Sequence, residues 1–177
     1  MYHRPNRFIH PRNTQTPKVK IRSARAADAG GFVRLVNELA KFEKLDPPSE
    51  SACRRLVADV FKLKRINLFV AEDRGGLVGY ALFFYTYSSF LAKPSLYLED
   101  LFVLEEYRKQ GVGFALFRKC VDQAISKGCG RMEWAVLTWN QKAIEFYERL
   151  GAERLSDWHV FRLDERGLGD FPKALRR

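Results

Sequence analysis

One stretch of the chain limits the possible folds more than any other: an apolar strand pattern that passes through a glycine-containing loop into a helix pattern. The strand pattern covers Ser95–Val103, glycines follow at Gly111 and Gly113, and apolar residues then recur at helical spacing over about Val112–Lys127. Glycines at such a junction let the backbone approach an anion closely, and the first free N–H groups of the helix point at it. The stretch therefore predicts an α/β fold with an anion-binding loop; an ordinary strand-to-helix turn is the alternative.

The other strand and helix patterns extend this unit into one mixed sheet. Apolar runs, alternating or continuous, predict strands at about residues 18–24, 66–72, 77–87, 95–103, 131–137, 153–155 and 158–163. Helical spacing of apolar residues predicts helices at about 29–44, 49–62, 112–127 and 141–150. The order is β-α-α-β-β-β-α-β-α-β-β, which predicts a single α/β domain with a mixed central sheet.

The net charge of the chain is concentrated at its N-terminus. Thirty-one basic and 21 acidic residues give +10, but residues 1–25 hold seven basic residues and no acid, and residues 162–177 add +2. The body, residues 26–161, is left with +1, so it offers no basic face for nucleic acid. Residues 1–17 contain three prolines and are expected to form a flexible basic arm, with an organelle-targeting peptide as the alternative.

Other composition features narrow the class of protein. No apolar run reaches the roughly 18 residues of a membrane span, and the N-terminus lacks the apolar stretch of a secretion signal. We therefore expect a cytoplasmic protein with no membrane partner. The three cysteines and three histidines are scattered, so we expect reduced thiols and no metal site.

Several motifs in a fixed order resemble a known family. Arg108-x-x-Gly111-x-Gly113 follows a Leu-Glu-Asp strand, and Asn-x-x-Ala-x-x-Phe-Tyr-x-x-x-Gly-Ala follows at residues 140–152. Together they resemble the Gcn5-related N-acetyltransferase (GNAT) superfamily. Glu-Leu-Ala-Lys-Phe-Glu at 38–43, Tyr-Leu-Glu-Asp at 97–100 and Trp-Asn at 139–140 resemble its spermidine/spermine and thialysine acetyltransferase branch.

The resemblance spans about residues 19–163 and implies an overall organisation. It implies an acetyltransferase domain over 18–165 with a C-terminal tail at 166–177, and a sheet splayed between its fourth and fifth strands. It also implies acetyl-CoA as cosubstrate and a homodimer. In this family an amine attacks the thioester directly, in a ternary complex.

The resemblance assigns the two proton transfers to Glu99 and Tyr147. An alkylamine with a pKa near ~10.4 is almost fully protonated at neutral pH, so freeing its lone pair costs roughly 4–5 kcal/mol and a base matters. Glu99 matches the family's carboxylate that acts through water, and burial in its strand is expected to raise its pKa. Asp100, on the opposite face, is the alternative. Tyr147 matches the family's general acid, which protonates the leaving thiolate.

The resemblance also implies the residues that bind acetyl-CoA. A β-bulge around Leu101–Val103 is expected to free a backbone N–H for the thioester oxygen. The glycine loop would hold the phosphates, with Arg108 binding phosphate or stabilising the loop. The cofactor-binding residues predicted in this way are Leu101, Phe102, Val103, Arg108, Lys109, Gln110, Gly111, Val112, Gly113, Phe114, Asn140 and Ala143.

The acceptor side departs from the polyamine pattern. Tyr87-Ser88-Ser89-Phe90 stands where polyamine acetyltransferases carry an acid and a tryptophan, and Phe42 replaces a tyrosine. Fewer carboxylates weaken the attraction for a polycation. The candidate acceptor-binding residues are Glu38, Phe42, Glu43, Tyr87, Phe90 and Glu99.

These observations predict an enzyme that acetylates a primary amine. The acceptor would be a small diamine, a polyamine or a lysine-like amino acid, with a shorter amine or a thialysine-like amino acid favoured over spermidine. A protein or peptide amine is the alternative acceptor. Two alternative functions belong to classes other than enzymes: a non-catalytic acyl-CoA sensor, and an accessory nucleic-acid binder that uses the basic arm.

Overall fold

The computed structural model describes residues 19–174 of the chain. They fall into two compact units, one ending at Ala135 and the other beginning at Val136, and each is described by itself. The expected basic arm, residues 1–17, lies outside the described residues.

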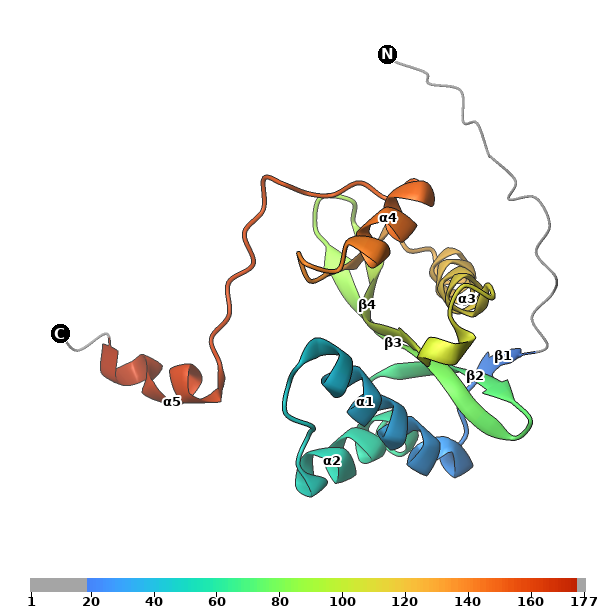
Figure 1. Ribbon diagram of the computed structural model, residues 1–177. Helices are drawn as coiled ribbons and strands as arrows, with labels where there is room; N and C mark the ends of the chain where they lie inside the picture. Colours follow the sequence, from blue (N-terminus) through green and yellow to red (C-terminus); the bar gives the residue numbers. More distant parts are fainter. Residues whose placement is uncertain (1–18, 175–177) are drawn as a thin grey trace, which may run out of the picture. The chain divides into compact units, whose positions relative to one another are not determined.

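The first unit is built on a five-stranded mixed sheet with the order β1-β2-β3-β4-β5 (Figure 1). Neighbouring strands are antiparallel from β1 to β4, and β5 runs parallel to β4. The bounds are β1 Lys20–Ser23, β2 Asn67–Asp73, β3 Gly76–Ser88, β4 Lys93–Val103 and β5 Arg131–Trp134. The predicted α/β class, the mixed sheet and the Asp73–Gly76 hairpin are confirmed.

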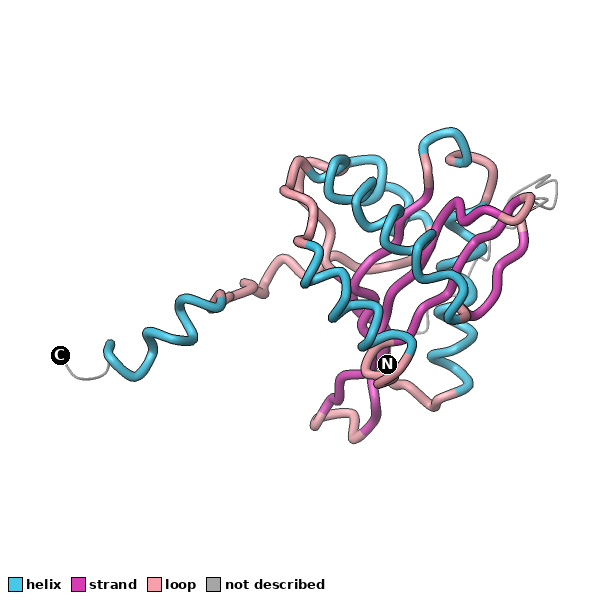
Figure 2. Tube along the Cα trace, turned by 90° about the horizontal axis from the view of Figure 1, so that it is seen from below, coloured by secondary structure: helices cyan, strands magenta, loops and turns pink. Residues whose placement is uncertain are grey.

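Helices cover both faces of this sheet. The helices of the first unit are α1 Ala29–Glu43, α2 Glu50–Phe61 and α3 Val112–Ser126, with short 3-10 turns at η1 Ala26–Asp28 and η2 Glu105–Tyr107. Phe32 and Leu35 of α1 share a buried cluster with Val70 and Tyr80 of the sheet. Figure 2 shows the strands side by side, with helices alongside them. Alternation places Leu68 and Val70 of β2, and Tyr80 and Leu82 of β3, on the α1 face.

The pairing between β4 and β5 is short. It runs from Ser95 opposite Arg131 to Leu98 opposite Trp134, whereas β4 continues to Val103. A sheet splayed between its fourth and fifth strands requires this early end to the ladder. The carboxyl-terminal half of β4 is thereby left unpaired on the β5 side within the described residues.

The second unit differs from the prediction. It contains α4 Gln141–Arg149 and α5 Glu165–Ala174, and the strands expected at 153–155 and 158–163 are absent from the described structure. A strand needs a neighbour for its backbone hydrogen bonds, and no strand of the described residues pairs with this stretch. The strand prediction is therefore wrong for these two segments.

The tail expected to begin at residue 166 contains most of α5. Asp164 provides the start signal, because its Oδ1 accepts a hydrogen bond from the Gly167 backbone N–H at 2.7 Å. Such a capping carboxylate, followed by Glu165 in the first turn, favours a helix.

Candidate active site

A β-bulge lies in β4 at the end of its pairing with β5. Leu82 of β3 pairs with Asp100, and the next residue, Phe83, pairs with Leu98, so Glu99 is the extra residue. The bulge expected around Leu101–Val103 is wrong in position, because those residues pair in regular register with Gly79–Ala81. A bulge is set by the register between two strands, which a single-strand pattern does not contain.

The bulge gives its two carboxylates different surroundings. Glu99 is exposed, whereas Asp100 is half-buried, so the expected burial of Glu99 is wrong. Burial, together with the negative charges of Glu99 and Glu43, raises the pKa of Asp100 to about 6. The only opposing contribution is a hydrogen bond from Tyr80. Asp100 therefore changes its charge at a pH of about 6.

The partner of Asp100 is a fully buried tyrosine on the neighbouring strand. The Tyr80 hydroxyl donates to Oδ2 of Asp100 at 3.1 Å, and its side chain has no exposed surface. The Phe32 ring packs edge-on against the Tyr80 ring, with 5.2 Å between the ring centroids. Burial raises the pKa of Tyr80, so its hydroxyl keeps its proton and acts as a donor. Tyr80 is not among the site residues predicted from the sequence, since only the strand register places it beside Asp100.

Two predicted acceptor-binding residues of α1 lie in different surroundings. Glu43 is half-buried, burial raises its pKa, and its charge acts on both Tyr80 and Asp100. Glu43 is thus placed close to the bulge. Glu38 accepts a hydrogen bond from Lys41 at 2.7 Å on the helix surface. Because Lys41 neutralises its charge, Glu38 offers less attraction to a cation than Glu43 does.

Arg108 connects the end of β4 to the end of α1. Its Nε donates to the Val103 backbone oxygen at 2.8 Å. Its guanidinium carbon lies 4.8 Å from the Phe42 ring centroid and 5.7 Å from that of Phe102. Phe42, predicted to contact the acceptor, therefore packs under a guanidinium. Arg108 stabilises the loop, which was one of its two expected roles.

Replacing Arg108 with Ala is expected to lower the free energy of unfolding by roughly 1.5–4.5 kcal/mol. The change removes one hydrogen bond and two cation–π contacts, each worth roughly 0.5–1.5 kcal/mol. Urea unfolding monitored by circular dichroism measures the difference. Arg108→Lys is the matched control, since it keeps the charge but loses the planar group and Nε; it should recover only part of the loss. An Ala variant as stable as the parent would contradict this role.

The predicted anion-binding loop has the expected geometry. Gly111 is the N-cap of α3 with φ +82°, and Lys109 has φ +60°. No side chain caps the helix start, so the first backbone N–H groups of α3 are not used by a cap. Val112 is buried beneath the loop and Phe114 is partly exposed, whereas Gln110 donates to the Glu106 backbone oxygen at 2.6 Å.

Two other predicted acceptor-binding residues are not brought to the bulge. Tyr87 and Phe90 are exposed at the far end of the β3–β4 hairpin, where Tyr87 pairs with Pro94. Tyr87 lies five positions along β3 from Leu82, the partner of Asp100, or roughly 16 Å of strand. Within this unit they cannot contact an amine held at the bulge.

The second unit contains the other predicted site residues on α4. Asn140 is the N-cap, as its position suggested, and its Oδ1 accepts from the Ala143 backbone N–H at 3.2 Å. Tyr147 packs against Phe146 with 5.1 Å between ring centroids. The roles of Asn140, Ala143 and Tyr147 in binding and catalysis stay predictions.

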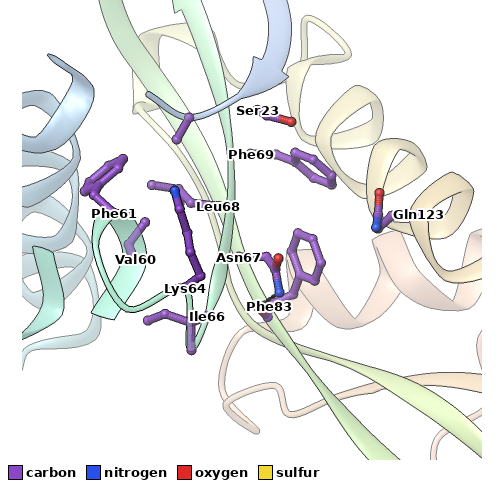
Figure 3. A pocket seen from close by; sticks show the side chains of 11 residues that line it. Ser23, Val60, Phe61, Lys64, Ile66, Asn67, Leu68, Phe69, Phe83 and Gln123 are labelled. Atoms are coloured by element: carbon purple, nitrogen blue, oxygen red, sulfur yellow. Dashed lines mark hydrogen bonds between the residues drawn. The ribbon is translucent and has the colours of Figure 1, made fainter. Parts of the chain in front are cut away.

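A surface hollow of about 220 Å³ lies elsewhere in the first unit (Figure 3). Phe69, Phe83 and Gln123 line it on one side, and Val60 and Phe61 on the other. None of the predicted site residues lines this hollow.

Among the described residues, no helix is both long and apolar enough to span a membrane.

Comparisons with known proteins agree with the fold and identify the family. Residues 34–152 match the Acetyltransferase (GNAT) family. The chain is 37% identical over 158 residues to the thialysine N-epsilon-acetyltransferase of Bos taurus, covering 82% of this chain and 92% of that protein. It is 46% identical over 87 residues to the L-ornithine N5-acetyltransferase NATA1 of Arabidopsis thaliana, covering 49% of this chain and 38% of that protein.

Solved structures share the fold. An integron cassette protein of V. cholerae superimposes with a TM-score of 0.78 at 21% identity, covering 89% of this chain and 99% of that one. AAC(6')-Iy, solved with the bisubstrate analogue CoA-S-monomethyl-acetylneamine, superimposes with a TM-score of 0.69 at 20% identity, covering 82% and 97%. The chain belongs to the GNAT family of acetyltransferases. Within that family it is an amine N-acetyltransferase.

Proposed function

We propose that this enzyme transfers the acetyl group of acetyl-CoA to the side-chain amine of a lysine-like or ornithine-like amino acid. The observation that carries the proposal is the carboxylate cluster at the β4 bulge, formed by Glu43, Glu99 and Asp100 around Tyr80. Such a cluster attracts one ammonium group and offers a base with a pKa near neutrality. The names of the relatives, thialysine and L-ornithine acetyltransferases, support an amino acid acceptor.

The bulge is suited to one cationic group rather than to an extended polycation. The cluster draws its acids from the end of α1 and from β4 only, and Lys41 pairs with the next acid along the helix, Glu38. Tyr87 and Phe90 contribute no carboxylate on the hairpin. We therefore place diamines second and spermidine last among the acceptors.

The proposed reaction is a direct transfer in a ternary complex. The loop of residues 109–114 and the start of α3 would bind the phosphates of acetyl-CoA through backbone N–H groups. A carboxylate of the Glu99–Asp100 pair accepts a proton from the bound ammonium, and the freed amine attacks the thioester carbonyl carbon. The carbon–sulfur bond then breaks, and Tyr147 donates a proton to the leaving thiolate. The homodimer stays a prediction from the family resemblance, and the cytoplasmic location stays a prediction from the composition.

A thiol-release assay tests the proposal. With acetyl-CoA fixed, the acceptor panel contains thialysine, lysine, ornithine, putrescine, spermidine and a lysine-containing peptide. We expect kcat/KM for the best amino acid to exceed that for spermidine by about tenfold or more, the effect of one lost charge contact. Release with the peptide alone would favour the protein-acetylation alternative. No release with any acceptor, from protein shown by calorimetry to bind acetyl-CoA, would favour the acyl-CoA sensor.

A further inference from the structure

We infer that Asp100, and not Glu99, accepts the amine proton, and that Tyr80 is a positioning residue that holds the Asp100 carboxylate in place. The inference rests on the proposed function and assigns roles within the same site. The family resemblance left two adjacent acids, Glu99 and Asp100, as candidates for the base, and the inference selects one of them.

The geometry of the bulge separates the two acids. Glu99 is the unpaired extra residue and is exposed, so water solvates its carboxylate and its side chain has no rigid support from the ladder. Asp100 stays in register with Leu82, which lies two residues from Tyr80 on β3 and therefore on the same face of the sheet. Its carboxylate is therefore fixed by the sheet as well as by a hydrogen bond.

Tyr80 is itself immobilised. Its ring is fully buried, contacts Phe32 edge-on, and lies 6.2 Å from the Phe102 ring between centroids. Its hydroxyl donates to Oδ2 of Asp100, and we assign the other oxygen, Oδ1, to the acceptor amine. A base held in this way loses little rotational freedom when the amine binds.

The charges around Asp100 give it the basicity that the reaction needs. Glu43 from α1 and Glu99 from β4 act on it with like charge, and Tyr80 from β3 donates the one hydrogen bond. The Arg108 guanidinium of the following loop is bound to the Val103 backbone oxygen and packs on Phe42 and Phe102. Burial and these two acids raise the pKa of Asp100 to about 6, close to the working pH of a general base.

The proton step balances without any further reactant. An N–H bond of the bound ammonium breaks, its electron pair stays on nitrogen, and the proton forms an O–H bond on Asp100. The nitrogen then bonds to the thioester carbon while the thiolate leaves with the carbon–sulfur electron pair. The second proton lost by nitrogen ends on sulfur, and Asp100 returns its proton to solvent.

The pH dependence of kcat/KM for the acceptor tests the inference, because it reports the pKa of the essential base in the free enzyme. We expect an acidic limb near pH 6 in the parent enzyme. Tyr80→Phe removes the bond that lowers the pKa of Asp100, so the limb should move up by about 0.5–1 pH unit. Glu99→Gln removes a charge that raises the pKa of Asp100, so the limb should move down in pH but should not disappear.

Tyr107→Phe is the matched control. It removes a tyrosine hydroxyl bonded to another aspartate, Asp73, at 3.0 Å, and should leave the limb where the parent has it. Carbon-13 NMR of the Asp100 carboxyl follows the same pKa without turnover. Asp100→Asn should remove the acidic limb. If Tyr80→Phe does not fold, this variant alone tests whether Asp100 is the base.

Three results would overturn the inference. In the first, Tyr80→Phe lowers kcat/KM at every pH but leaves the acidic limb at the pH of the parent enzyme. That result is expected if Tyr80 has only a structural role. The second is a limb that disappears in Glu99→Gln. The third is a limb that persists in Asp100→Asn. In all three cases the enzyme still acetylates amines, so the proposed function is unaffected. If the parent enzyme released no thiol with any acceptor of the panel, both the inference and the proposed function would be contradicted.

Discussion

Replacing Asp100 with Asn is expected to lower kcat/KM for the acceptor amine by about 10²–10⁴-fold, the usual contribution of a positioned general base. The amide keeps an oxygen that can accept the Tyr80 hydrogen bond, so the buried hydroxyl stays paired. The amide does not take up a proton from an ammonium group, so the loss is chemical rather than structural. Thiol release at about pH 7.5 measures the fall.

The same substitution should make the protein more stable at neutral and alkaline pH. The pKa of Asp100 is about 6 in the folded protein and about 3.9 in an unfolded chain. The folded state therefore binds this proton more tightly, and ionising the buried carboxyl costs folding free energy as pH rises from about 4 to 6. Above that range the cost is complete, about 2–3 kcal/mol, and Asn removes it.

Urea unfolding at two pH values separates this effect from a general one. The stability advantage of Asp100→Asn should be largest at about pH 8 and roughly half as large at about pH 5. Asp73→Asn, in the other tyrosine–aspartate pair, serves as the activity control and should keep kcat/KM near that of the parent. An Asp100→Asn protein that is less stable than the parent at pH 8 would contradict the assigned cost of this buried charge.

Local patterns predicted most of the first unit. The apolar spacing of Phe32 and Leu35 marked the buried face of α1, and the glycines at 111 and 113 marked the start of α3. Such signals work because a helix repeat or a left-handed cap is decided within a few residues. The family motif likewise indicated the adjacent acids Glu99 and Asp100.

Properties that depend on a second strand were not accessible from the sequence. The bulge falls at Glu99 rather than at 101–103 because Leu82 and Phe83 set the register. Tyr80 gains its role only from that register, since nothing in its own strand pattern distinguishes it from a core aromatic residue. The apolar residues over 158–163 predicted a strand, but a strand also requires a partner for its backbone groups, and none of the described strands pairs with this segment.

Replacing Tyr147 with Phe is expected to lower kcat by about 10²-fold or more while leaving the KM for acetyl-CoA nearly unchanged, as for an interaction made only in the transition state. A thiolate whose thiol has a pKa near ~8.5 can leave unaided, so residual activity is expected. Phe keeps the ring that packs on Phe146 and removes only the hydroxyl, so α4 should fold as in the parent.

The matched control is Tyr85→Phe, which also loses a tyrosine hydroxyl; the Tyr85 hydroxyl accepts a hydrogen bond from Gln123 at 2.9 Å. Its kcat should stay within about twofold of the parent, the range of surface substitutions. A second measurement uses an acetyl thioester whose thiol is more acidic than that of CoA. Because that thiolate leaves more readily without protonation, the fold decrease in kcat caused by Tyr147→Phe should be smaller with this thioester than with acetyl-CoA. An equal defect with both thioesters, or a rise in KM at unchanged kcat, would assign Tyr147 to binding rather than to proton donation.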